Sequence, residues 1–503
     1  MFILQLLLVA AVSALGGNYL QDICPESFCS LPDMKAEYAL SQAPNITELH
    51  LGYCRELEVL QSTPNLRILS LSNCHDDPFA KEDIQLTYKL NKLHIRHSKI
   101  SKLHNNQFSV MYRLEILELG GNSIERVANG TFRELTLLET LGLQKNLIKS
   151  LPEDVFHPLE NLRNLDLSDN QISNISEGVF ARNPNLKTLF LRGNPLTHIV
   201  FPTQGPQSFI QLLDFGRCSQ LKELVLYSNV DTIILEECGV ERLQFTGNKS
   251  LFRLRAANSK LTNMILGDPI SLIELDLRGT HLLGKNISKV ICNMRSLQRL
   301  DLSHNSIDTL PLSSNNVSPD VCLLPSLRFL NLSSNRLVSL QLESSFFGPR
   351  LSFLDLSHNK LECFSLEALD AAHDLQSLLL AGNNLTTFKY RTLHQGHRNL
   401  KTLNLFGNQF SANLYNEMIE YFSYTDVNFI VKDCPEKSKD KHHKWSVYDI
   451  LIVIFLLGVL VYARMYLYGR GGINCCFGCK WGQRTEDTSE SRVRFLMRPE
   501  SES

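Results

Sequence analysis

Three cysteines lie within five residues of one another near the C-terminus, in the stretch GRGGINCCFGCKWGQR at residues 469–484. Thiolates at this spacing can bind zinc or exchange disulfides. Cys475, Cys476 and Cys479 are one ligand short of a structural zinc site, and no histidine lies near them. Cys476 and Cys479 match the C-x-x-C redox motif, but no alternation of strands and helices surrounds them. Their chemistry therefore depends on the compartment that holds them.

An apolar segment at residues 447–468 precedes these cysteines and reaches the roughly 20 residues that a membrane-spanning helix needs. At the other end of the chain, an apolar run with a small-residue cleavage pattern predicts a secretory signal peptide over residues 1–14. We therefore expect a single-pass type I plasma membrane protein with an extracellular N-terminus and a cytoplasmic tail at 469–503. The three cysteines would then lie beside the membrane, which favours S-palmitoylation, with free reduced thiols as the alternative.

Glycosylation sequons support this orientation, because all of them precede the predicted span. Seven of them are predicted sites, and the use of an eighth, Asn248, depends on how the repeats described below are phased. The seven are Asn45, Asn129, Asn174, Asn286, Asn316, Asn331 and Asn384.

A row of aspartates is the second group that could do chemistry. Asp166, Asp276, Asp301 and Asp355 recur in the motifs LDLSDN, LDLRGT and LDLSHN and could form a row of carboxylates. We interpret them as strand residues on a solvated face, because no H-E-x-x-H, G-x-S-x-G or phosphate-binding motif accompanies them. We expect no enzyme activity, cofactor or metal. A formal net charge of −2 gives no electrostatic support for nucleic-acid binding.

The elements that position these residues are repeats of the template L-x-x-L-x-L-x-x-N. Template starts at 66, 90, 114, 138, 162, 186 and 210 are spaced by 24 residues, and further starts follow from 297 to 400. Each repeat predicts a short parallel strand with inward leucines and a turn closed by asparagine. The predicted fold is an α/β solenoid, a horseshoe of about sixteen coils over 44–425, with an N-terminal cap at 15–43 and a stalk at 426–446.

The middle of the chain has two possible phases, because template matches recur about every ten residues between 210 and 272. Only the phase 210, 230, 251 and 272 joins the series on both sides. The other matches, at 221, 240 and 261, are expected to form extended segments on the opposite arm. Phe108, Phe132, Phe156 and Phe180 recur every 24 residues and are expected to stack as an apolar spine.

These motifs resemble leucine-rich repeats. A long repeat ectodomain with one membrane span resembles the leucine-rich repeat receptor and adhesion proteins of animals, including Toll-type ectodomains without the Toll signalling domain. The two-phase middle and the C-terminal repeats resemble insect leucine-rich immune proteins. The usual cap sequence Trp-x-Cys is replaced here by Phe410-Ser411-Ala412, so the cap disulfide of that family is not expected.

The resemblance implies a receptor or co-receptor that binds protein or microbial ligands in innate immunity, with cell–cell adhesion in development as the alternative. A homodimer or heterodimer is a possible arrangement. The tail is too short for a signalling domain, so a cytoplasmic adaptor or co-receptor would be needed.

Ligands are expected on the concave side, where the x positions of the strands lie and most residues are small or polar. The departures from this pattern are candidate ligand-binding residues, although each could be an isolated surface residue. They are Lys92, His94, Arg96, His97, Phe190, Arg192, Phe252, Arg253 and Arg255.

The remaining cysteines divide into two classes. Cys54, Cys74, Cys218 and Cys238 occupy the asparagine position of the template and are predicted to be buried free thiols. The other class contains the disulfide candidates, which are Cys24 with Cys29 in the cap and Cys292 with Cys322 in adjacent coils; Cys363 and Cys434 stay unassigned.

Overall fold

The computed structural model describes most of the predicted repeat region. The described residues are 28–31, 45–52, 57–75, 77–80, 87–199, 201, 210–226, 229–245, 251–266, 271–280, 291, 294–309, 324–340 and 347–430. Within these ranges, no helix is long and apolar enough to cross a membrane. The predicted signal peptide, the span at 447–468 and the palmitoylation candidates lie outside the described residues.

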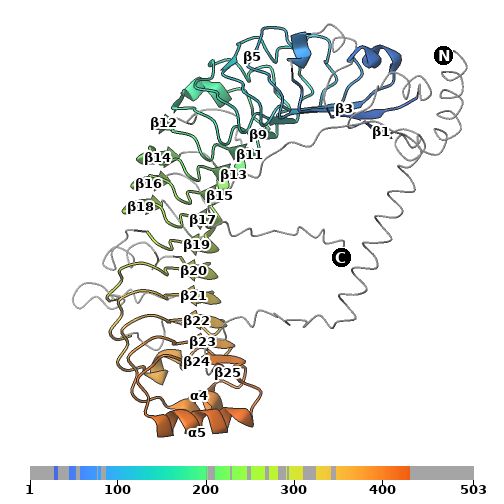
Figure 1. The fold of residues 1–503 in the computed structure, drawn as a ribbon. Coiled ribbons are helices and arrows are strands. Elements are labelled where there is room, and N and C mark those ends of the chain that lie inside the picture. Colours follow the sequence, from blue (N-terminus) through green and yellow to red (C-terminus); the bar gives the residue numbers. More distant parts are fainter. Residues whose placement is uncertain are drawn as a thin grey trace, which may run out of the picture. The chain divides into compact units, whose positions relative to one another are not determined.

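One long parallel sheet of eighteen strands runs through the described chain (Figure 1). In ladder order the strands are β1 (Phe28–Leu31), β2 (Glu48–Leu51), β3 (Ile68–Ser72), β4 (Lys92–Arg96), β6 (Ile116–Glu118), β8 (Thr140–Gly142), β9 (Asn164–Asp166), β11 (Thr188–Phe190), β13 (Ile210–Asp214), β15 (Val230–Ile234), β17 (Arg253–Arg255), β19 (Glu274–Asp276), β20 (Arg299–Asp301), β21 (Phe329–Asn331), β22 (Phe353–Asp355), β23 (Ser377–Leu379), β24 (Thr402–Asn404) and β25 (Asn428–Ile430).

Each strand belongs to one coil, and the described strands form a solenoid of more than a dozen coils. The template leucines are buried and pack against their equivalents in neighbouring coils, which holds the coils together. Leu141, Leu165 and Leu189, for example, lie in register on β8, β9 and β11 and are fully buried. The predicted phase is confirmed in the middle of the chain, where β13, β15, β17 and β19 pair in succession. The sheet also includes β1 and β25, which lie beyond the predicted repeat boundaries of 44 and 425.

The alternative template matches form extended segments, as predicted, and these segments pair into a second parallel sheet, here called the outer sheet. It contains β14 (Glu223–Leu226), β16 (Arg242–Phe245) and β18 (Asn263–Leu266). These strands lie on the other side of the solenoid from β13, β15 and β17 (Figure 1). Two further short pairs join β5 (Lys102–Leu103) to β7 (Arg126–Val127) and β10 (Asn174–Ile175) to β12 (His198–Ile199).

Helices are short and few among the described residues. The 3-10 turns are η1 (Leu57–Ser62), η2 (Pro78–Ala80), η4 (Glu177–Phe180) and η6 (Leu366–Leu369). The α-helices α4 (Tyr390–Gly396) and α5 (Ala412–Ser423) lie in the last coils before β25. Helix α5 begins at Ser411, whose Oγ accepts a hydrogen bond from the backbone N–H of Leu414, and it buries Met418 and Phe422.

The predicted phenylalanine spine is confirmed and is longer than expected. The ring centroids of Phe108, Phe132, Phe156 and Phe180 lie 6.0, 6.2 and 6.2 Å apart, with nearly parallel planes. Phe201 continues the stack at 6.2 Å. The spine therefore runs from Phe108 to Phe201, through the coils that start at 90 to 186, and ends where the coils shorten.

Asparagines at the template position tie neighbouring coils together and form an asparagine ladder. The Nδ2 of Asn170 donates to the carbonyl oxygens of Leu143 at 2.9 Å and Leu167 at 3.0 Å, and its Oδ1 accepts from the N–H of Ile148 at 3.1 Å. One side chain thus satisfies buried backbone groups of two successive coils, which is the reason for its place in the repeat.

The predicted aspartate row lies on strands of the sheet, as expected, and its carboxylates also cap turns. The Oδ1 atoms of Asp166, Asp276 and Asp301 accept hydrogen bonds from the backbone N–H two residues later, at 2.9, 3.0 and 3.0 Å. Asp301 is only 5% exposed, so the prediction of a solvated row was wrong at this position. Burial raises the pKa of Asp276, and the nearby Asp301 carboxylate adds to the shift.

Two of the predicted buried thiols are confirmed and one is not. Cys218 and Cys238 are free and buried. Cys74 is buried but disulfide-bonded, which corrects the prediction of a free thiol. Cys363 is free and exposed. The side chains of the predicted disulfide cysteines lie outside what the structure describes.

We predict that Asn170→Ala lowers the free energy of unfolding by about 3 kcal/mol or more, since each buried group that loses its partner costs about 1–3 kcal/mol. Asn161→Ala is the matched control, because the exposed Nδ2 of Asn161 donates to the Thr136 carbonyl at 2.8 Å and water can replace it. Urea denaturation followed by circular dichroism measures both. Equal midpoints for the two variants would contradict the ladder's role.

We predict that Asp276→Asn raises the melting temperature near neutral pH. The folded state raises the pKa of this carboxyl, so the stabilisation from its protonation is complete below the unfolded-state pKa and is lost as pH rises through the folded-state pKa. The amide keeps an oxygen for the Arg278 N–H, so the gain should shrink towards about pH 3. Asp276→Ala loses the turn cap and should melt at a lower temperature than the unsubstituted chain, both near neutral pH and at about pH 3. If Asp276→Asn also melts at a lower temperature at both pH values, the buried charge of Asp276 is not destabilising and the prediction is wrong.

Candidate ligand-binding surface

The outward side chains of the eighteen-stranded sheet form one continuous surface, here called the ladder face. Strand alternation separates it from the core: on β4, Leu93 and Ile95 are buried, whereas Lys92, His94 and Arg96 reach solvent. Because the core consumes only the alternate residues, the ladder-face side chains can vary without disturbing the fold.

The first predicted group lies on β4, as expected. The Nη2 of Arg96 lies 3.6 Å from Oε2 of Glu118, which also accepts a hydrogen bond from Gln144 at 3.3 Å. Burial lowers the pKa of His94, and the positive charge of Arg96 adds to this effect. His97 follows the strand with a φ of 53° and is exposed. This group is a hydrogen-bonding surface of mixed charge.

The second predicted group lies on and after β11. Phe190 is half-buried and pairs in register with Asp166 and Asp214. The guanidinium of Arg192 reaches Glu236 at 3.9 Å, two coils further on. It crosses Gly216, where any Cβ would collide with it. Arg192 therefore has a partner within the fold.

The third predicted group lies on β17. Arg253 and Arg255 both approach Glu274, at 3.7 and 3.3 Å. Arg253 also lies 3.9 Å from Asp231. Phe252 precedes the strand and is half-buried. The two arginines are exposed ion-pair partners, and their interaction contributes little to stability.

The structure does not bring the three predicted groups together. Strands β6, β8 and β9 separate β4 from β11, and β13 and β15 separate β11 from β17. At about 4.8 Å per strand, the seven steps from β4 to β17 span roughly 34 Å. A single small ligand cannot contact all three groups.

Sequence reasoning missed the most ordered ladder-face cluster, here called the aromatic stack, which consists of Arg299, Phe329 and Phe353. The guanidinium of Arg299 lies 3.7 Å above the centroid of the Phe329 ring. The rings of Phe329 and Phe353 are 4.5 Å apart and inclined by 5°. Both phenylalanines are half-buried and Arg299 is exposed. All three lie two residues after a template start, at 297, 327 and 351. Alignment of the repeats, followed by comparison of this one position between successive repeats, would have found them.

Beyond Phe353 the same face carries smaller side chains, here called the shelf. Ser377 on β23 and Thr402 on β24 follow Phe353 in register, and Leu379 follows Asp355. All three are half-buried. Neither Ser377 nor Thr402 carries a ring, so the stack ends at Phe353 and the ring faces small neighbours.

Sequons lie at known places on this surface. Asn45, Asn129, Asn174 and Asn384 are exposed, whereas Asn331 lies on the ladder face beside the stack. The Nδ2 of Asn331 donates to Asp301 at 3.2 Å, and its Oδ1 accepts from the Ser333 N–H at 3.0 Å. Asn248, Asn286 and Asn316 lie outside the described residues.

No group of three or more His, Cys, Asp or Glu side chains in the described ranges is placed to hold a metal ion. The expectation of no metal and no enzyme activity stays a prediction.

Comparison with known proteins agrees with this architecture. Family models described as leucine-rich repeats match residues 89–148, 136–196, 325–385 and 296–318. A comparison with curated protein sequences found no match.

Three solved structures illustrate the structural similarity. A leucine-rich repeat protein of Leptospira interrogans is 22% identical, with a TM-score of 0.61 over 80% of this chain and 99% of that one. Drosophila Toll in complex with Spätzle is 21% identical, with a TM-score of 0.63 over 76% of this chain and 53% of that one. The APL1 leucine-rich repeat domain is 20% identical, with a TM-score of 0.52 over 81% of this chain and 93% of that one.

At these identities the similarity concerns the fold alone, while the family models identify the repeats directly in the sequence. The chain therefore contains leucine-rich repeats and folds as a leucine-rich repeat solenoid of parallel strands.

Proposed function

We propose that this chain is a single-pass cell-surface receptor or co-receptor whose repeat ectodomain binds a protein ligand on the ladder face, at the aromatic stack and the shelf. The observation that carries the proposal is the ordered stack of Arg299, Phe329 and Phe353 on a face where the core needs no large side chains. Aromatic and arginine side chains dominate the binding energy of protein interfaces.

The stack is suited to binding because it is already ordered. Arg299 covers one face of Phe329 and Phe353 covers the other, so these side chains have little conformational entropy left to lose when a ligand arrives. The ring of Phe353 beside Ser377 and Thr402 offers a stacking surface to an apolar or aromatic ligand side chain. Asp355 lies next to Leu379 and can accept hydrogen bonds from the same ligand.

Similar solved structures support a recognition role. Toll was solved bound to Spätzle and is described as a hub in Drosophila development and innate immunity. By analogy, we propose a protein ligand and a role in innate immune recognition. The signal peptide and membrane span predicted from sequence put the repeats outside the cell. The second candidate is cell–cell adhesion, for which clumping of cells that express the full-length chain is the direct test.

The binding site is tested by substitution in the full-length chain on cells, with a protein ligand first selected from a panel of extracellular proteins. We expect Phe353→Ala to weaken binding at least about tenfold, as for interface hot spots. Ser377→Trp should do the same, because it fills the shelf and leaves the stack in place. Phe190→Ala is the matched control, since it removes another half-buried ladder-face phenylalanine, and it should change affinity by less than about twofold.

If Phe190→Ala loses ligand binding and Phe353→Ala keeps it in full, the ligand binds at β11 and the aromatic stack is not the binding site. Surface expression of each variant, measured with an antibody to an N-terminal tag, separates loss of binding from loss of folding.

We also predict that Asn331 carries no glycan in the active protein. Its Nδ2, the atom that would bear the sugar, donates to Asp301, and a glycan there would cover the neighbouring Phe329. Site-resolved mass spectrometry should find glycans at Asn129, Asn174 and Asn384 and none at Asn331. Full occupancy of Asn331 would exclude a protein ligand from the stack.

A further inference from the structure

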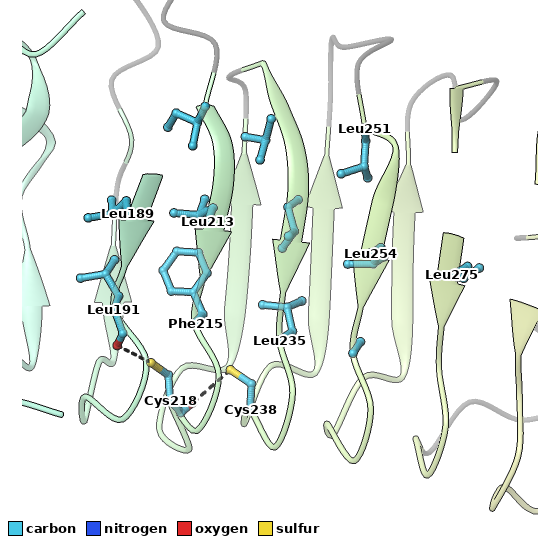
Figure 2. Packing of buried hydrophobic residues seen from close by; sticks show 14 of the residues in the cluster. Leu189, Leu191, Leu213, Phe215, Cys218, Leu235, Cys238, Leu251, Leu254 and Leu275 are labelled. Carbon is cyan, nitrogen blue, oxygen red and sulfur yellow. Dashed lines mark hydrogen bonds between the residues drawn. The ribbon is translucent and has the colours of Figure 1, made fainter. Parts of the chain in front are cut away.

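Cys218 and Cys238 occupy equivalent places in two adjacent coils. Each follows its strand, β13 or β15, by four residues, and the two strands pair in parallel register. The backbone pairing continues past the strands, because the N–H of Arg217 donates to the Glu236 carbonyl at 2.8 Å. The N–H of Gly239 donates to the Cys218 carbonyl at 3.0 Å. The two cysteines are therefore held side by side, as Figure 2 shows.

The coils approach each other closely at this point. A Cβ at Gly239 would collide with the carbonyl oxygen of Ser219, so glycine is required there. Neighbouring parallel strands lie about 4.8 Å apart, and a disulfide joins residues whose Cα atoms are roughly 4.4–6.8 Å apart. Two cysteines in register on adjacent coils are held at about this spacing.

Both thiols stand where other coils have a ladder asparagine, and they replace it poorly. The Sγ of Cys218 donates to the Leu191 carbonyl at 3.4 Å, and the Sγ of Cys238 donates to the Cys218 carbonyl at 3.2 Å (Figure 2). Asn194, one coil earlier, makes two N–H···O bonds and also accepts one from Ile172. A thiol is a weak donor and a weak acceptor. The two cysteines therefore hold this position with fewer and weaker hydrogen bonds than asparagine does.

The same spacing of cysteines occurs a second time in the sequence. Cys74 holds the asparagine position of its coil and is disulfide-bonded. In the sequence, Cys54 precedes Cys74 by 20 residues, just as Cys218 precedes Cys238 by 20 residues. In both cases the spacing is that of a short coil, which puts the two cysteines at the same template position.

We propose that Cys218 and Cys238 are a second disulfide site, which closes between adjacent coils when the chain folds in the presence of a disulfide oxidant such as glutathione disulfide. One thiolate attacks the oxidant and releases one reduced glutathione, and the other thiolate displaces the second from the mixed disulfide. Two thiols and one glutathione disulfide become one protein disulfide and two glutathione thiols, which carry the two protons.

Burial determines when this reaction can occur. Both side chains are 1% exposed or less. Burial raises the pKa of Cys218 to about 12 and that of Cys238 to about 11, so almost no thiolate exists at neutral pH in the folded chain. The folded protein should therefore keep the redox state that Cys218 and Cys238 had when the chain folded, either two thiols or one disulfide. Cys363, which is free and exposed, should exchange freely.

The experiment translates the full-length chain into nanodiscs in a buffer of either reduced glutathione or mixed reduced and oxidised glutathione. Each product is alkylated with N-ethylmaleimide while folded, and then denatured and alkylated with iodoacetamide, before peptide mass spectrometry. From the oxidising buffer we expect peptides that contain Cys218 and Cys238 joined by a disulfide. From the reducing buffer, both should carry only the second label. Cys363 serves as the internal control and should carry the first label in the reduced product.

A second arm adds glutathione disulfide to the chain that folded reduced. Less than about a tenth of the Cys218–Cys238 pair should oxidise within hours, because both side chains are buried and protonated and only a thiolate attacks a disulfide. Both cysteines free in the oxidising preparation, or either one joined to a different cysteine, would overturn the proposal. Cys218→Ser, with Cys363→Ser as its matched control, should leave Cys238 as a buried thiol that carries only the second label.

Discussion

The structure depends on the pairing of buried backbone groups between successive coils. Each coil ends its strand in a turn whose carbonyl and N–H groups face the interior rather than water, and such groups are costly when they lack partners. A ladder asparagine solves this problem with one side chain, because its amide donates to carbonyl groups of its own coil and of the preceding coil, and accepts from an N–H of that preceding coil. The position before it takes a positive φ in many coils, as in Lys145, Asp169 and Gly193, which turns the chain towards the asparagine. Leucine burial supplies the driving force, but these polar contacts determine the register in which the coils stack.

That constraint explains where the protein can vary. Inward strand positions are occupied by apolar residues, most often leucine or isoleucine, and turn positions by groups that satisfy the backbone. The outward strand positions are free of both demands unless they cap the following turn, as Asp166 and Asp301 do, so large apolar or arginine side chains there need another explanation. The aromatic stack is of this kind, since Arg299, Phe329 and Phe353 contact one another across three coils and remain partly exposed. Arg192 is also an arginine at an unusual position in the repeat, but its guanidinium passes over Gly216 and pairs with Glu236, so its place is explained by a contact within the fold.

Much of the fold could be predicted because its period is visible in the residues. Residue spacing alone predicted the main-sheet phase, with template starts at 210, 230, 251 and 272. It also predicted the opposite strands that follow 221, 240 and 261, and the phenylalanine spine that starts at Phe108. The candidate site was harder to predict. Phe329 and Phe353 lie in repeats separated by 24 residues, and their contact appears only when the coils are superposed. The strand positions of the aspartates were predicted, but the burial of Asp301 and its turn-capping role were not, because the donor is a backbone N–H two residues away, which composition does not reveal.

The outer sheet has a consequence for how the molecule yields under stress. It occurs where the asparagine ladder lapses, after Cys218, Cys238 and Ser259. There, cross-coil backbone hydrogen bonds run along two sides of the solenoid, through β13, β15 and β17 and through β14, β16 and β18. Pulling two such coils apart requires both ladders to break together, whereas elsewhere in the described chain the only strands paired on the second side are the two-residue strands β5 with β7 and β10 with β12. The middle of the chain thus acts as a barrier to the spread of local unfolding, and fraying that starts at one end is confined to that half.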